Sequence, residues 1–311
     1  MSEVLRSAPT LGPEQREMVA HLTTSGNGVD VVLGVAGSGK THALAVANDA
    51  WLRAGLRPRG AALAARAAKE LNAQSAIPSQ TVDSLLRDLD RGTDELTNRT
   101  VLVVDEAGML GTRTLARLLD CAERVGTKVV LVGDDRQLPE IEAGGAFRGL
   151  ANRLPTVRLT ESRRQTHAVE INALAALRTG RVHDAVAALG EIGGVTIHSS
   201  AGDARAAMIE RWVSARASGE DAVMLATRRT QVAQLNREAR SRLIDAGAIA
   251  PHGIEVRGRE FSAGDRIVTL TNWHRAGIIN GTRGEVVGVT SDSVTVEFDH
   301  GERTTLPPTY L

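Results

Sequence analysis

The sequence predicts an α/β protein built on a parallel sheet, and three observations support this fold class. Short apolar and β-branched runs, such as residues 29–35, alternate in the first half of the chain with longer segments of helical periodicity, such as residues 40–54. A glycine-rich segment joins these two runs. Polar residues directly follow two further apolar runs, which is typical of parallel strands that end at one edge of a sheet.

Composition indicates an ordinary globular protein. Of 311 residues, 42% are hydrophobic and 24% are charged, which argues against disorder and against a fibrous fold. Lys plus Arg and Asp plus Glu both total 37, so any DNA contact would need locally clustered charge. The single cysteine, Cys121, cannot form an internal disulfide. No apolar run has the length of a signal peptide or a membrane span, so we expect a cytoplasmic protein without membrane contact.

The first domain is expected to cover residues 1–165. Pro13 suits a first helical turn, and the apolar residues Met18, Val19 and Leu22 follow it at helical spacing. Strand and helix then alternate as far as residue 132, which indicates βαβ units. We expect helices at 13–24, 40–54 and 112–125, and strands at 29–35, 61–65, 101–104 and 128–132.

Two further regions are expected beyond residue 165. Residues 166–250 have the pattern of a second α/β unit. Residues 251–311 alternate in short runs with turn signals at 280–281 and 291–292, as in a small β-barrel. We expect helices at 168–179, 182–189, 203–218 and 230–246, and strands at 222–225, 267–270, 284–289 and 294–298.

A phosphate-binding loop is predicted between the first strand and its helix. Residues 34–41 fit the pattern GxxxxGK[ST], in which backbone N–H groups and the helix dipole face a β-phosphate. Lys40 would contact the β and γ oxygens of ATP, and the Thr41 hydroxyl would ligate Mg²⁺. The alternative is an ordinary glycine-rich turn. The predicted nucleotide site comprises Gly34, Val35, Ala36, Gly37, Ser38, Gly39, Lys40, Thr41 and His42.

Two carboxylates follow the apolar run at 101–104. We expect this run to be the strand next to the phosphate-loop strand, so that Asp105 would support Mg²⁺ through water. Glu106 would orient and deprotonate the attacking water, as in enzymes that hydrolyse ATP rather than transfer its phosphate to another small molecule. The alternative is an acidic pair that caps the next helix.

A third apolar run, at 129–132, also ends in polar residues. Its polar tip is expected to face the γ-phosphate, where Gln137 would hydrogen-bond the phosphate or the water. Polar residues after a strand are also ordinary turn formers, so the position of Gln137 leaves both interpretations open.

Taken in order, these motifs resemble the superfamily 1B helicases, and most closely the RecD-like motor portion of MobF-type conjugative relaxases (TraA/TrwC/TraI-like). The resemblance covers nearly the whole chain and continues through residues 224–229, 264–268 and 280–284. The segments that match the family's glutamine motif and motifs I, Ia, II, III and IV are residues 11–15, 34–41, 64–68, 105–109, 131–138 and 159–165.

The resemblance implies a RecA-like first domain, a partial second RecA-like domain at 166–250 and an SH3-like barrel at 251–311. It implies that Gln15 reads adenine, that Gln137 couples the γ-phosphate to DNA and that Arg164 is an arginine finger. Single-stranded DNA is the implied partner, with Arg66 and Thr81 in segments that contact its backbone in relatives. Lone Arg and Thr residues are more often solvated or capping residues.

Two departures from the family pattern bear on function. In relatives, motifs V and VI follow at the point where this chain ends, so a polypeptide that supplies them is one candidate partner. We expect the chain alone to bind ATP but hydrolyse it slowly. The nuclease domain of relaxases has no counterpart here, because Tyr310 is the only tyrosine and the eight histidines are scattered. We therefore expect no DNA nicking.

The sequence thus predicts an ATP-dependent helicase-type motor module that uses ATP and Mg²⁺. One alternative is a nucleotide-binding module that holds ATP without turnover and acts by interaction. Another is an unrelated P-loop enzyme, either a GTPase or a small-molecule kinase. The chain has no Asn-Lys-x-Asp segment to read guanine, and Glu106 and Gln137 disfavour a kinase.

Overall fold

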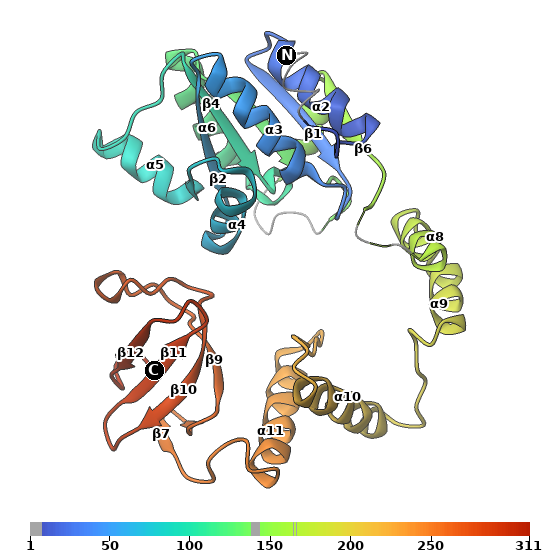
Figure 1. Cartoon of the computed structure of the whole chain (residues 1–311), viewed down its shortest axis with the longest axis vertical. Helices are drawn as coiled ribbons and strands as arrows, with labels where there is room; N and C mark the ends of the chain where they lie inside the picture. The colour runs from blue at the N-terminus through green and yellow to red at the C-terminus, as the bar shows by residue number, and fades with distance from the viewer. Residues whose placement is uncertain (1–7, 138–143, 164, 166) are drawn as a thin grey trace. The chain divides into compact units, whose positions relative to one another are not determined.

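The computed structural model describes residues 8–137, 144–163, 165 and 167–311. The chain divides into two compact units, Met1–Gly194 and Val195–Leu311 (Figure 1). The domain boundaries expected from the sequence, after residues 165 and 250, stay predictions. Among the described residues, no helix is both long enough and apolar enough to cross a membrane.

The first unit is built on a six-stranded sheet in which every neighbouring pair is parallel, with the order β3-β2-β4-β5-β1-β6. This confirms the predicted α/β fold with a parallel sheet. The expectation that the strand before Asp105 lies directly beside the phosphate-loop strand is wrong, because β5 pairs with both β1 and β4 and separates them. The strands are β1 (Val29–Gly34), β2 (Arg57–Ala62), β3 (Ser79–Thr81), β4 (Thr100–Asp105), β5 (Lys128–Gly133) and β6 (Thr156–Leu159).

Helices cover both faces of this sheet (Figure 1). Val101 and Val103 of β4 pack in one apolar cluster with α2, α3 and α4, while Leu102 and Val104 pack in a second cluster with α5, α6 and α7. Alternate residues of a strand point to opposite faces, so a continuous apolar run is what a sheet covered on both faces requires. The helices are α2 (Pro13–Thr24), α3 (Lys40–Arg53), α4 (Ala65–Ser75), α5 (Val82–Arg91), α6 (Thr112–Val125) and α7 (Ala146–Ala151), with a short 3₁₀ helix η1 (Ala107–Met109).

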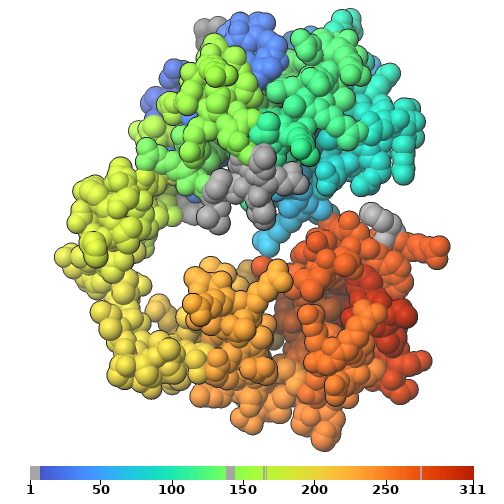
Figure 2. All heavy atoms as spheres, turned by 180° about the vertical axis from the view of Figure 1, so that it is seen from behind, coloured from blue at the N-terminus to red at the C-terminus, as the bar shows by residue number. Residues whose placement is uncertain are grey.

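A helical hairpin completes the first unit. Helices α8 (Ala168–Arg178) and α9 (Val182–Glu191) pack through small side chains, of which Ala173, Ala176 and Ala185 are buried. Figure 2 shows this hairpin in yellow-green to yellow, projecting from the rest of the unit.

The second unit combines a pair of helices with short antiparallel strands. Helices α10 (Ala201–Ala217) and α11 (Arg229–Asp245) pack around Ile209, Leu235 and Ala239. Four strands form a sheet in the order β12-β11-β10-β9, and β7 and β8 form a separate hairpin that packs on the same apolar core. The strands are β7 (Ile254–Val256), β8 (Arg259–Phe261), β9 (Arg266–Val268), β10 (Arg283–Val289), β11 (Val294–Phe298) and β12 (Arg303–Leu306), with a 3₁₀ turn η2 (His274–Ala276).

The strand expected at 222–225 is not formed. Val223 is 68% exposed and Leu225 is 79% exposed, and the structure has no strand among the described residues between 160 and 253. An apolar run becomes a strand only where another strand offers its backbone groups for pairing. The second RecA-like domain and the closed SH3-like barrel therefore stay predictions.

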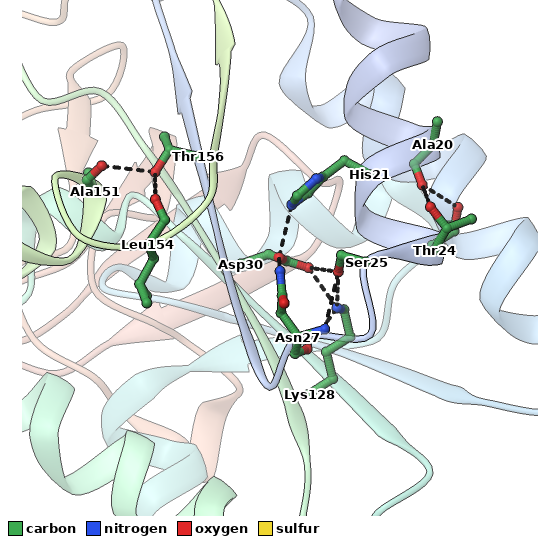
Figure 3. A network of polar contacts seen from close by, with 11 residues as sticks. Ala20, His21, Thr24, Ser25, Asn27, Asp30, Lys128, Ala151, Leu154 and Thr156 are labelled. Carbon is green, nitrogen blue, oxygen red and sulfur yellow. Dashed lines mark hydrogen bonds and ion pairs between the residues drawn. The ribbon is translucent and has the colours of Figure 1, made fainter.

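A buried polar cluster holds the amino ends of β1 and β5 and the end of α2 together (Figure 3). The Asp30 carboxylate is fully buried and accepts hydrogen bonds from Lys128 Nζ at 2.6 Å, Ser25 Oγ at 2.7 Å and Asn27 Nδ2 at 2.9 Å. His21 Nε2 lies 2.9 Å from the same carboxylate. This cluster lies at the amino end of β1, so it stabilises the sheet at the edge opposite to the phosphate loop.

Replacing Asp30 by asparagine is expected to destabilise the protein, because it leaves the largely buried Lys128 ammonium without its counter-ion. We expect the free energy of unfolding at neutral pH, measured by urea denaturation, to fall by about 3 kcal/mol. The control is Asp49→Asn, since Asp49 forms an exposed ion pair with Arg53 on one helix. That variant should lose less than about 0.5 kcal/mol.

The effect of Asp30 should also depend on pH. Burial would raise the pKa of Asp30, but hydrogen bonds from Lys128, Asn27 and Ser25 outweigh it and hold the pKa below its usual value. The stabilisation is therefore fully present above the unfolded-state pKa of about 3.9 and is lost as pH falls through the lower folded-state pKa. The difference between wild type and Asp30→Asn should shrink in acid; a difference that persists undiminished to about pH 2 contradicts this account.

Candidate nucleotide-binding site

A pocket of about 550 Å³ lies at the carboxyl edge of the parallel sheet. Residues 36–42, which run from the loop after β1 into α3, form one wall. Asp105 and Glu106 after β4, Gln137 after β5 and Arg163 after β6 also line the pocket. The structure thus brings the predicted loop residues Lys40 and Thr41 together with both carboxylates and Gln137 in one place.

The loop between β1 and α3 has the backbone that its glycines allow. Gly37 and Gly39 both have φ of 77°, a conformation that other residues rarely adopt. Lys40 Nζ crosses the loop and donates hydrogen bonds to the Gly34 carbonyl at 2.8 Å and the Val35 carbonyl at 3.2 Å. A Cβ on Gly34 would lie 2.6 Å from Cδ of Lys40, so only glycine leaves room for this path.

The loop fits a bound phosphate. The Ser38 hydroxyl is buried and has no hydrogen-bond partner within the described structure, although buried polar groups are usually paired. A phosphate oxygen beside the loop would give this hydroxyl an acceptor. The loop also lies at the amino end of α3, a helix of 14 residues, where free N–H groups and the helix dipole favour an anion.

Gln15 supports this loop from behind. Its side chain is 2% exposed, its Oε1 accepts from the Gly12 N–H at 2.9 Å, and its Nε2 donates to the carbonyls of Ser38 and Gly39, each at 3.1 Å. The amide group is thus bonded to backbone at both ends. The contact between Gln15 and adenine, inferred from the resemblance, stays a prediction.

The acidic pair lies in a strained turn at the end of β4. Glu106 has φ of 52°, in the left-handed region that non-glycine residues seldom occupy, and its N–H donates to Oδ1 of Asp105 at 3.0 Å. Such strain is concentrated at functional sites. Burial, and to a lesser degree Glu70, raise the pKa of Asp105, while the Glu106 N–H and Lys40 oppose the rise.

The environment of Glu106 favours a proton acceptor. Burial raises the pKa of Glu106 and the neighbouring Asp105 charge raises it further, whereas Lys40 lowers it. A carboxylate whose pKa is raised is a stronger base than an ordinary surface glutamate. This direction is consistent with the predicted role of Glu106 as the base.

The predicted Mg²⁺ ligands Thr41 and Asp105 both line the pocket. Mg²⁺ is usually held by one or two protein oxygens together with phosphate oxygens and water, and a hydroxyl and a carboxylate meet that requirement. In the described residues, no group of three or more His, Cys, Asp or Glu side chains could hold a metal ion by itself. His42 lies at the rim, where its Nε2 is 2.9 Å from Oγ1 of Thr10.

Arg164, the predicted arginine finger, lies outside the described residues. Its neighbour Arg163 lines the pocket, donates its N–H to the Gly37 carbonyl at 2.8 Å and directs its guanidinium to the Thr10 carbonyl at 3.4 Å. A Cβ on Gly12 would lie 1.7 Å from Nη2 of Arg163, so the guanidinium packs directly on this glycine. Arg163 was not predicted as a site residue, and its only signal in the sequence is its position beside Arg164.

The two predicted DNA-contacting residues do not line this pocket. Arg66 is exposed in the first turn of α4. Thr81 is the N-cap of α5, and its Oγ1 accepts a hydrogen bond from the Ser84 N–H at 3.1 Å. The capping role that the sequence left open for Thr81 is therefore observed, and its contact with DNA stays a prediction.

Comparison with known proteins places the chain in a family. The sequence model of the AAA domain family matches residues 10–200. The conjugal transfer protein TraA of Rhizobium radiobacter is 33% identical over 306 residues, which cover 97% of this chain and 28% of TraA. The ATP-dependent RecD2 DNA helicase of Deinococcus radiodurans is 28% identical over 299 residues, which cover 93% of this chain and 40% of RecD2.

Solved structures agree on the fold. Bacteroides Pif1 bound to single-stranded DNA matches with a TM-score of 0.61 at 20% identity, over 96% of this chain and 74% of that chain. The present chain spans only 28% of the TraA protein that it matches. The family match covers more than half of the chain, and together with the TraA and RecD2 matches it confirms the resemblance seen in the motifs. The chain therefore belongs to the AAA domain family and is a relative of TraA and of the RecD-like superfamily 1B helicases.

Proposed function

We propose that the chain is an ATP-hydrolysing motor module of the RecD-like helicase type, acting on single-stranded DNA. The observation that carries the proposal is the pocket in which Lys40 and Thr41 of the phosphate loop meet the acidic pair and Gln137. A structural glycine-rich turn would not require carboxylates from a strand two positions away in the sheet. The link to DNA comes from relatives such as the RecD2 DNA helicase.

Each pocket residue has a role that follows from its chemistry. Lys40 would exchange its two carbonyl acceptors for the β and γ oxygens of ATP, and Thr41 and Asp105 would hold Mg²⁺, which neutralises charge on the phosphates. Glu106 would accept a proton from the attacking water, and Gln137 would orient that water or contact the γ-phosphate. Arg164 remains the proposed arginine finger.

DNA binding should rest mainly on contacts with phosphates. The chain contains only three Trp, three Phe and one Tyr, so stacking of bases on aromatic rings can contribute little. Phosphate contacts release counter-ions, so affinity should fall steeply with salt. Arg66 and Thr81 are the proposed contacts, and a polypeptide that supplies motifs V and VI stays a prediction.

The proposal is tested by measuring ATP hydrolysis with and without an oligo-dT single strand. We expect hydrolysis to be slow alone and to rise at least several-fold with the DNA. ATP binding without any DNA effect on turnover would instead favour the module that holds ATP and acts by interaction.

Lys40→Ala is expected to abolish tight binding of Mg-ATP, because the negative charge of the β- and γ-phosphates then lacks its partner in the loop. Calorimetric titration measures the affinity directly. Lys69→Ala is the control, because Lys69 is an exposed lysine of α4 that does not line the pocket. An unchanged affinity in Lys40→Ala would reject the phosphate-loop assignment.

Glu106→Gln is expected to separate binding from hydrolysis, since it keeps the shape of the side chain and removes the base. We expect ATP affinity to stay within about twofold while single-turnover hydrolysis falls by roughly 10²-fold or more. Hydrolysis at the wild-type rate would show that Glu106 is not the general base.

Gln15→Ala distinguishes two ways in which Gln15 can serve the site. Its observed bonds to Ser38 and Gly39 support the loop that binds phosphate, so we expect ATP and GTP affinities to fall by a similar factor. Binding of both nucleotides is measured by competition with a fluorescent ATP analogue. A loss confined to ATP would instead support the adenine contact implied by the resemblance.

A further inference from the structure

A second, partly buried ion pair lies beside the nucleotide pocket, between the loop after β5 and the end of α8. Asp134, whose side chain is 1% exposed, accepts two hydrogen bonds from the guanidinium of Arg178, at 2.8 and 2.9 Å. Its Oδ1 also accepts the Arg136 N–H at 3.0 Å. A bidentate pair with one fully buried partner fixes both distance and orientation.

The contact is reciprocal. The Arg136 side chain donates to the backbone carbonyl of Arg178, at the end of α8 where carbonyls lack helical partners and a cation is favoured. The loop and the helix end therefore hold each other through two arginines, with one side chain contributed by each segment.

The loop that Arg178 holds carries Gln137 and also contacts the turn that follows Glu106. Gln137, which lines the pocket, follows Asp134 by three residues. The loop also packs against the turn that follows Glu106, because a Cβ on Gly108 would lie 3.3 Å from the Asp134 carbonyl and a Cβ on Gly133 would lie 3.1 Å from the Gly108 nitrogen. A displacement of Asp134 would therefore be transmitted to Gln137 and to the segment that carries Glu106.

We propose that Arg178 is a positioning residue for ATP turnover: by holding Asp134, it fixes the loop that carries Gln137 and supports the turn that carries Glu106. This inference rests on the proposed function and extends it to a residue that does not line the pocket. Arg178 belongs to the α8–α9 hairpin, which follows the pocket residue Arg163 in the chain and leads on to the second unit. The position of this hairpin is thereby tied to the catalytic loops.

The test compares Arg178→Ala, Arg178→Lys and the control Arg181→Ala, in turnover assays with oligo-dT present. Arg181 lies in the turn of the same hairpin and pairs with Asp184 in an exposed contact, so its loss changes surface charge without touching Asp134. We expect Arg178→Ala to lower kcat about tenfold while KM and the ATP dissociation constant stay within about twofold. Arg178→Lys should recover part of kcat, because lysine keeps the charge but not the two-pronged contact. Arg181→Ala should match wild type.

Hydrogen exchange without nucleotide decides the positioning claim independently of turnover. Amides of residues 134–137 should exchange at least several-fold faster in Arg178→Ala than in wild type or Arg181→Ala, while amides of the β1 strand stay unchanged. Unchanged exchange at 134–137 would overturn the inference, as would a fall in kcat matched by an equal loss of ATP-binding sites or of affinity. Failure of wild type to bind ATP would reject the proposed function instead, and the exchange result would still decide the role of Arg178.

Discussion

The Lys40 ammonium lies across its own loop, on the carbonyls of Gly34 and Val35, and the rest of the site is arranged around that loop. Gln15 holds the loop from α2 by two bonds to its carbonyls, and Arg163 holds it from the end of β6 by a bond to Gly37. Three segments distant in sequence thus converge on one short stretch of backbone. A ligand that binds Lys40 draws its ammonium away from these carbonyls, while the bonds from Gln15 and Arg163 keep the loop in place.

Much of the first unit could be predicted from the sequence. Strands covered on both faces require continuous apolar runs, and such runs identified β1, β4 and β5. Pro13 marked the start of α2. The order of strands could not be predicted, because nothing in the chain order shows that β5 separates β1 from β4. The start of β2 was missed because Arg57 and Arg59 interrupt its apolar pattern, and Arg59 is accommodated by an ion pair with Asp94.

The candidate site shows the same division. Residues whose role follows from local spacing, such as Lys40 and Glu106, could be predicted because a loop, a strand end and a helix start are local features. Roles that depend on side-chain pairing between distant segments could not. The bond of Gln15 to Gly39 spans 24 positions and the pair of Asp134 with Arg178 spans 44, and neither residue type nor spacing indicates such partners.

When the pocket binds ATP, we expect Lys40 to exchange the loop carbonyls for phosphate oxygens. A crystal structure of the chain with Mg²⁺ and a non-hydrolysable ATP analogue tests it most directly. We expect the β-phosphate to lie against the N–H groups of residues 36–41, the Ser38 hydroxyl to gain an acceptor, and Lys40 Nζ to bond to phosphate. A nucleotide bound elsewhere, or Lys40 still on the carbonyls of Gly34 and Val35 with the phosphates in place, would contradict it.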